Sequence, residues 1–269
     1  RRVEPGAGSE IPRHWNEDGR RAARIFELLT PSHPRREKYL EEGDVLNAER
    51  LTRYLVQRRE EPSPRVDFYD ATRIMERDIT VQILLDISGS TGEKTGEEKK
   101  IRLEQHAALV LGEGLAALGD SFAVSGFNSA GPAACVFEVY KDFDDAWDDA
   151  ARRAIVSSRP GNSTRMGPAL RHAGARLRGR ESAHRLILVV TDGRPMDAAY
   201  DPSTGYAQHD VRVACEENER AGIATLGIST DETSADDMAV MFPYRRYAIM
   251  HSMAELPRVL PQLYLAATA

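Results

Sequence analysis

The sequence has few cysteines and no long hydrophobic run. Its 269 residues include two cysteines, Cys135 and Cys215, which lie far apart. This argues against a disulfide framework and favours a reducing compartment, which we expect to be the cytoplasm. No apolar stretch approaches the roughly 20 residues that span a bilayer, so we expect no transmembrane helix. No secretory signal is visible either.

An excess of basic residues is also missing. The net charge is −6 and the pI is near 5.7, which argues against a nucleic-acid-binding protein. Residues 1–77 hold 16 Lys and Arg against 15 Asp and Glu, a net of +1, so the remainder carries −7 (−6 − 1). The chain begins RRVEPG, without Met, and we expect it to be part of a longer protein.

The most informative stretch, residues 78–90, reads DITVQILLDISGS. An apolar run followed by turn residues is typical of a buried parallel strand. Asp86, Ser88 and Ser90 occupy alternate positions, and residues two apart in extended chain point to the same side. Gly89 permits a tight bend between the serines. Three oxygens can therefore converge at the carboxyl end of the strand, where open α/β sheets bind ligands.

A second apolar strand, at residues 185–191, is also followed by an acid, Asp192. Between the two strands lies a polar loop, residues 161–165, just before the helix expected at 166–178. It reads GNSTR and contributes the hydroxyl of Thr164. Two buried strands that end in acids place both carboxylates on one rim of the sheet. Hard oxygen donors without Cys or His suit Mg²⁺ or Mn²⁺. The sequence therefore predicts a metal site made by Asp86, Ser88, Ser90, Thr164 and Asp192.

Other interpretations compete with a metal site. An acid and hydroxyls at this spacing also cap helices and close turns. Residues 89–95, GSTGEKT, faintly resemble a phosphate-binding loop, but Glu93 interrupts the required Gly-Lys pair and would repel phosphate. Two acids with a metal could serve a phosphohydrolase, although no His or Lys is visibly placed as acid or base. His172 reads as a surface or core residue, and Asp197 as a loop acid or a partner contact.

Strand and helix patterns alternate from residue 78 onward. The strands at 121–127 and 135–140 are joined by a link too short for a crossover helix, so they should form an antiparallel hairpin. Repeated strand–helix units predict an α/β fold with a mostly parallel sheet, one antiparallel edge strand and helices on both faces. Apolar spacing predicts helices at 97–118, 143–156, 166–178, 207–221, 235–241 and 253–266, and further strands at 223–228 and 244–249.

Residues 1–77 are expected to form a helical or irregular N-terminal extension before a domain at 78–269. Apolar spacing favours helices at 19–29 and 45–59, and Asn47 could cap the second. Prolines break the segments around these helices. The extension is either an arm packed on the main domain or a docking surface for a partner.

The five predicted ligands match a known motif. Asp86-x-Ser88-x-Ser90, Thr164 and Asp192 resemble the metal-ion-dependent adhesion site of von Willebrand factor type A domains, which implies a Rossmann-like fold over residues 78–269. That family often has an acidic residue after the first serine, where this chain has Gly89. Longer stretches resemble the C-terminal domains of NorD- and CbbO-type activation proteins: GDSFAVSGFNS (119–129), YKDFDDAWDD (140–149), STRMGPALRHAGARL (163–177), LILVVTDGRPMD (186–197) and ELPRVLPQLY (255–264).

The resemblance implies an adaptor rather than an enzyme. Proteins of this kind work with MoxR-type AAA+ ATPase hexamers, and they are linked to nitric oxide reductase activation or to rubisco activation. The five residues would hold Mg²⁺ or Mn²⁺, with one coordination position left for an acidic residue of a client enzyme or of the ATPase. Two alternatives remain: a metal-dependent phosphohydrolase, and a binding module that works without an ATPase.

Overall fold

The computed structural model describes residues 1–4, 10–28, 35–61, 63–73, 78–95, 98–193, 195–197, 200–250, 255 and 259. The chain divides into two units, one made by Arg1–Leu29 with Asp78–Ala269 and the other by Thr30–Arg77. Within the described ranges, no helix is both long enough and apolar enough to cross a membrane.

The apolar runs of the larger unit form a six-stranded sheet. All neighbouring strands are parallel except the pair at one edge, which is the expected antiparallel hairpin. The α/β fold with one antiparallel edge strand is therefore confirmed. In spatial order the strands are β11 (Tyr247–Ile249), β10 (Ile223–Ser229), β9 (His184–Thr191), β4 (Ile79–Asp86), β7 (Ser121–Ser129) and β8 (Cys135–Lys141).

The two most apolar strands, β4 and β9, are neighbours at the centre of this sheet. Every residue of β4 is buried, as are the last six residues of β9. Strands covered on both faces are apolar throughout, which explains their composition. The register pairs Leu85 with Val190, so both strands end at the same level.

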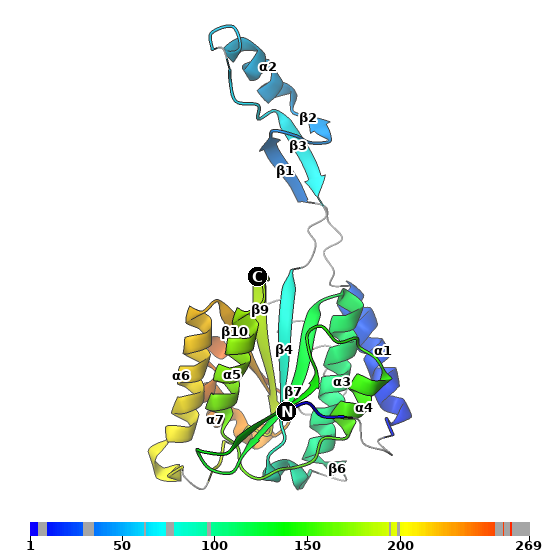
Figure 1. Ribbon diagram of the computed structural model, residues 1–269, viewed down its shortest axis with the longest axis vertical. Helices are drawn as coiled ribbons and strands as arrows, with labels where there is room; N and C mark the ends of the chain where they lie inside the picture. The colour runs from blue at the N-terminus through cyan, green and yellow to red at the C-terminus, as the bar shows by residue number, and fades with distance from the viewer. Residues whose placement is uncertain are drawn as a thin grey trace. The chain divides into compact units, whose positions relative to one another are not determined.

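Helices cover both faces of the sheet (Figure 1). Successive strand residues alternate between the faces, so Ile83 joins one hydrophobic cluster and Leu84 the other. One face carries α1 (Arg13–Leu28), α3 (Lys100–Leu118) and α4 (Asp149–Val156), and the other carries α5 (Met166–Arg178), α6 (Tyr206–Arg220) and α7 (Ala235–Met241).

Helix α1 packs on α3, so the expected division of the chain at residue 77 differs from the one observed. The indole of Trp15 stacks on the imidazole of His106, with ring centroids 4.8 Å apart. Phe26 lies so close to Gly114 that a Cβ there would come within 2.9 Å of the ring. Because these side chains are buried in the main core, α1 belongs to the larger unit and residues 30–77 form the separate one.

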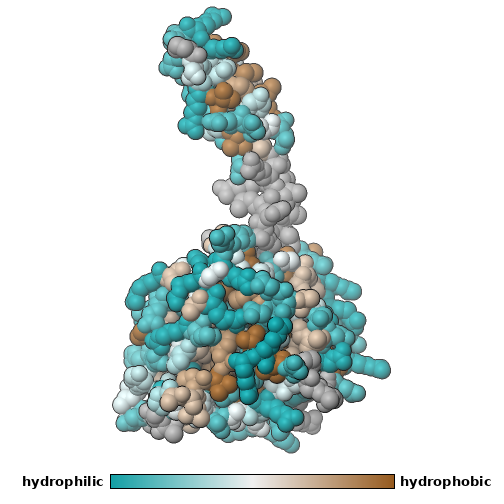
Figure 2. Space-filling view, in the orientation of Figure 1, coloured by the Kyte–Doolittle hydropathy of each residue, from teal (hydrophilic) through white to brown (hydrophobic). Residues whose placement is uncertain are grey.

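The smaller unit contains strands that the sequence pattern did not indicate. β1 (Arg35–Leu40), β3 (Tyr69–Arg73) and β2 (Val45–Leu46) pair antiparallel in that order. Helix α2 (Ala48–Gln57) follows β2, and the side chain of Asn47 caps it by accepting a hydrogen bond from the Arg50 N–H, as predicted. Figure 2 shows brown, hydrophobic patches on this unit. Its exposed large apolar or aromatic side chains are Tyr39, Val45, Leu46, Leu55 and Val56.

Some element limits differ from those expected. Helix α4 begins only at Asp149, because Asp148 caps it by accepting a hydrogen bond from the Ala151 N–H. Strand β11 is shorter than predicted, since Pro243–Arg245 form a 3₁₀ turn. The helix predicted at 253–266 lies outside the described residues except for Glu255 and Val259.

Candidate metal centre

The predicted ligands come from three segments: the carboxyl end of β4 and the loop after it, the residue after β9, and the loop between α4 and α5 that carries Thr164. Asp86 is the last residue of β4, and Asp192 directly follows β9. A hydrogen bond of 2.8 Å from the Thr191 hydroxyl to Oδ2 of Asp86 joins the two strand ends. Both carboxylates are almost fully buried, with exposed fractions of 0% and 2%. The structure thus places the two acids on the same rim of the sheet.

The loop after β4 turns its serines inward beside Asp86. The Ser88 N–H donates to Oδ1 of Asp86 at 3.0 Å, and the Ser88 and Ser90 hydroxyl oxygens lie 3.1 Å apart. A 3₁₀ turn, η1 (Gly89–Gly92), follows, and the Thr91 hydroxyl closes it on the Ser88 carbonyl at 2.6 Å. The short spacing of this motif therefore gives three neighbouring oxygen-bearing side chains, as predicted.

The loop that carries Thr164 lies against the same turn. The Gly161 N–H donates to the Ile87 carbonyl at 2.6 Å, and the Gly89 N–H donates to the Asn162 carbonyl at 2.5 Å. A Cβ at residue 89 would lie only 2.7 Å from that carbonyl oxygen. An acidic side chain at this position would therefore force the loops apart, which explains why Gly89 stands here.

A buried ion pair anchors the Thr164 loop. Oδ1 of Asp197 lies 3.3 Å from Nη2 of Arg165, while its Oδ2 accepts a hydrogen bond from the Ser129 hydroxyl at 2.8 Å. The Thr164 N–H donates to the Met196 carbonyl at 2.7 Å. Asp197 is 4% exposed, so it acts as a loop acid and is not available as a partner contact.

The electrostatics of the rim are unfavourable for two ionised carboxylates side by side. Burial and then the charge of Asp192 raise the pKa of Asp86 to about 7, although hydrogen bonds from Ser88 and Thr191 favour its ionised form. The Nζ of Lys100 lies 3.8 Å from Asp192, but it is closer to Asp231, at 3.1 Å. A divalent cation would relieve the repulsion between the acids.

Sequence reasoning missed three polar groups around the rim: Lys100, Glu104 and Thr191. Lys100 and Glu104 are one helical turn apart on α3, and their spacing of four residues places them on one face. Thr191 directly precedes Asp192, so its position next to the acid is visible in the sequence. Nothing in the sequence alone indicates that α3 turns Lys100 toward Asp192.

The donor set fits a hard divalent cation. It offers carboxylates and hydroxyls, the oxygen donors that Mg²⁺ and Mn²⁺ accept. Across the described ranges, no group of three or more His, Cys, Asp or Glu side chains is arranged to hold a metal, so a cation here depends on the hydroxyls. His172 is a packing residue, because its ring meets that of Phe137 edge-on with centroids 4.5 Å apart.

Known proteins match both the sequence and the fold. The sequence model of the von Willebrand factor type A domain matches residues 81–194, a range that includes all five predicted ligands. The protein NorD of Brucella suis is 31% identical over 246 residues, which are 91% of this chain and 38% of that protein. An uncharacterized protein of Pseudomonas aeruginosa is 30% identical over 258 residues, which are 95% of this chain and 42% of that protein. The chain therefore spans less than half the length of these relatives.

Among solved structures, the conserved hypothetical protein BatB from Bacteroides thetaiotaomicron has the same fold. Its TM-score is 0.52 at 17% identity, and the match covers 71% of this chain and 98% of that one. At this identity the likeness concerns the fold alone.

Proposed function

The chain belongs to the NorD family and carries a von Willebrand factor type A domain, and on this premise we propose that it is a non-catalytic adaptor that couples an ATPase to a client enzyme. Two contacts are needed for such a role, one to each partner. Two surfaces of the larger unit are suited to them.

The first surface is the rim of the sheet with a divalent cation. Asp86 and Asp192 would supply carboxylates to Mg²⁺ or Mn²⁺, and Ser88, Ser90 and Thr164 would supply hydroxyls. When bound, the cation would offer a coordination position to an exposed Asp or Glu of another protein. The observation that carries this part is the burial of Asp86 beside Asp192, because paired buried carboxylates are stabilised by a cation.

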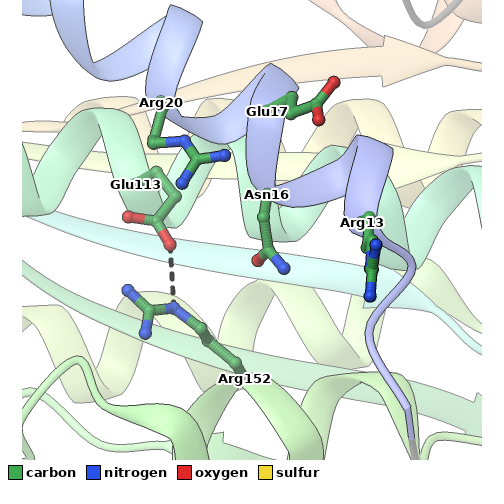
Figure 3. A pocket seen from close by; sticks show the side chains of 6 residues that line it. All are labelled: Arg13, Asn16, Glu17, Arg20, Glu113 and Arg152. Atoms are coloured by element: carbon green, nitrogen blue, oxygen red, sulfur yellow. Dashed lines mark hydrogen bonds and ion pairs between the residues drawn. The ribbon is translucent and has the colours of Figure 1, made fainter.

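The second surface is a hollow of about 400 Å³ between α1, α3 and α4. Figure 3 shows Glu113 turned toward Arg152, to which it is paired at 2.8 Å, with Arg20 of α1 on the other side of Glu113. No described carboxylate pairs with Arg13 or Arg20, so they are free to meet an acidic side chain of a partner. The hollow is lined by Arg13, Asn16, Glu17, Arg20, Glu113 and Arg152.

The partners follow from the resemblance. The ATPase would be a MoxR-type AAA+ hexamer, and the client would be nitric oxide reductase or rubisco. The chain lacks a phosphate-binding loop at residues 89–95, because Glu93 interrupts the Gly-Lys pair. The energy for remodelling would therefore come from the ATPase. Both cysteines are free thiols in the structure, which suits work in the cytoplasm.

Calorimetry with Mg²⁺ and Mn²⁺ tests the metal site. We expect wild-type protein to bind with modest affinity and an Asp86→Ala, Ser88→Ala double variant to lose binding. A matched control is Asp201→Ala with Ser203→Ala, since this exposed pair has the same spacing, and Asp201 likewise accepts from the Ser203 N–H at 2.9 Å. Equal binding by all three proteins would contradict the site.

Pull-downs with a MoxR-type hexamer and with each client test the adaptor. We expect Asp86→Ala to abolish one contact and Arg13→Glu with Arg20→Glu the other, each leaving the second intact. Phosphate-ester hydrolysis that Asp86→Ala abolishes would support a phosphohydrolase instead. ATP hydrolysis by the chain alone, lost in Lys94→Ala, would overturn the adaptor proposal.

A further inference from the structure

Glu104 is an acidic residue on the buried side of helix α3. It lies on α3 with an exposed fraction of 0%, among buried neighbours such as Ile101, Ala107 and Ala108. Both of its carboxylate oxygens are buried and have no hydrogen-bond partner among the described residues. A buried polar group without a partner costs about 1–3 kcal/mol, and more if it is charged, so this position calls for an explanation.

The helix face that carries Glu104 is turned toward the metal centre. Lys100 lies one turn earlier on that face, and its Nζ is 3.8 Å from Oδ2 of Asp192. Helix α3 packs on β4, which ends at Asp86, on β9, which ends just before Asp192, and on η1, which contains Ser90. Glu104 therefore sits behind the rim, on the side where α3 meets the ends of the two central strands.

Taken together, the charged groups around Glu104 do not stabilise its carboxylate. Burial raises the pKa of Glu104 well above its usual range, and the charges of Asp86 and Asp192 raise it further, while Lys100 lowers it. Lys100 is engaged by Asp231 at 3.1 Å. A protonated Glu104 would still need an acceptor for its O–H, and the described residues offer none.

We propose that Glu104 is a further carboxylate of the metal centre, which accepts hydrogen bonds from water coordinated to a divalent cation at the rim. This rests on the metal site proposed above and adds a residue outside its five ligands. Carboxylates behind a metal site hold coordinated groups in place and raise affinity, and losing one typically costs 10–100-fold in metal binding. The role explains why an acid without a protein partner occupies the core face of α3.

The test compares the wild-type chain of 269 residues with Glu104→Gln and Glu104→Met. Glu113→Gln is the matched control, because it removes one carboxylate from the same helix at a site that pairs with Arg152. Mn²⁺ affinity is measured by calorimetry, and the melting temperature is measured in EDTA and in excess Mn²⁺. We expect both Glu104 variants to bind Mn²⁺ about tenfold or more weakly, while Glu113→Gln binds as wild type does.

Melting separates this role from one in packing. We expect Glu104→Met to melt higher than wild type in EDTA, because an unpaired acid has left the core, yet to gain less on adding Mn²⁺. Wild-type Mn²⁺ affinity in both Glu104 variants would overturn the inference while leaving the five-ligand site standing. Absence of Mn²⁺ binding by wild-type protein would instead overturn the site itself.

Discussion

At the scale of single residues, two buried carboxylates repel each other in the candidate site. Asp86 is fully buried beside Asp192, and its pKa in the folded protein, about 7, is above its ordinary value of 3.8. Ionising such a group opposes folding. The contribution of Asp86 to the stability of the metal-free protein is therefore most favourable below pH 3.8 and is lost as pH rises toward 7.

Replacing Asp86 by Asn should stabilise the metal-free protein at pH 8. The raised pKa of Asp86 alone corresponds to about 4 kcal/mol of destabilisation, which the variant avoids. The loss of one hydrogen-bond acceptor costs the variant roughly 1–2 kcal/mol, so we expect its free energy of unfolding to be higher by about 2 kcal/mol. Urea unfolding in EDTA measures it. Excess Mg²⁺ should reduce the gain, because it stabilises only the wild-type protein, and a less stable variant in EDTA would contradict the account.

At the scale of elements, the contact between α1 and α3 depends on an uncharged histidine. His106 is buried under Trp15, and its Nε2 lies 3.2 Å from Oδ2 of Asp18. Burial lowers the pKa of His106 to about 4; His14 and Arg102 lower it too, while Asp18 acts in the opposite direction. Because the folded protein disfavours the charged form of His106, the contribution of this residue to the free energy of unfolding is complete above pH 6.5. That contribution is lost as pH falls from 6.5 to 4.

Replacing His106 by Phe should remove this pH dependence while keeping an aromatic ring against Trp15. Between pH 7 and pH 5 we expect wild-type protein to lose about 2 kcal/mol relative to the variant. Comparing the two proteins cancels the titration of Asp86, which has the opposite sign. Urea unfolding at both pH values tests this, with exposed His209→Phe as the control. A constant difference between wild type and His106→Phe would count against it.

At the scale of the whole molecule, the two units differ in how they are built. The larger unit has a hydrophobic cluster on each face of its sheet, whereas the smaller one leaves several large apolar side chains exposed and buries few. Helix α1 precedes the smaller unit in sequence but lies in the core of the larger one. A truncated form of the larger unit should therefore keep α1 and leave out only residues 30–77.

Replacing residues 30–77 with a flexible Gly/Ser linker should leave the larger unit folded, with its melting temperature changed by no more than a few degrees. Deleting residues 1–28 should destabilise it by roughly 4 kcal/mol or more, because Trp15 and Phe26 leave the core. Thermal melting compares the two variants. The account fails if removing residues 30–77 costs as much stability as removing α1.

The sequence by itself determined the features that depend on neighbours along the chain. Apolar runs and helical spacing identified the strands of the six-stranded sheet and helices α3 to α7, and a short link identified the hairpin of β7 and β8. Asp86 and Ser88 share a side because alternate residues in extended chain do so, while Ser90 comes beside Ser88 through the local 3₁₀ turn at Gly89–Gly92. The second apolar strand that ends in an acid and the polar loop at residues 161–165 added Asp192 and Thr164, and the resemblance to a known motif covers the same five residues.

Only the tertiary structure decided which distant groups surround those residues. The packing of α1 on α3, the three strands of the smaller unit and the position of Glu104 behind the rim all join segments far apart in sequence. The pKa of Asp86 likewise depends on burial by both strand ends and on Asp192, more than 100 residues away. Spacing along a chain carries local geometry, whereas burial and charge interactions arise only when the chain folds onto itself.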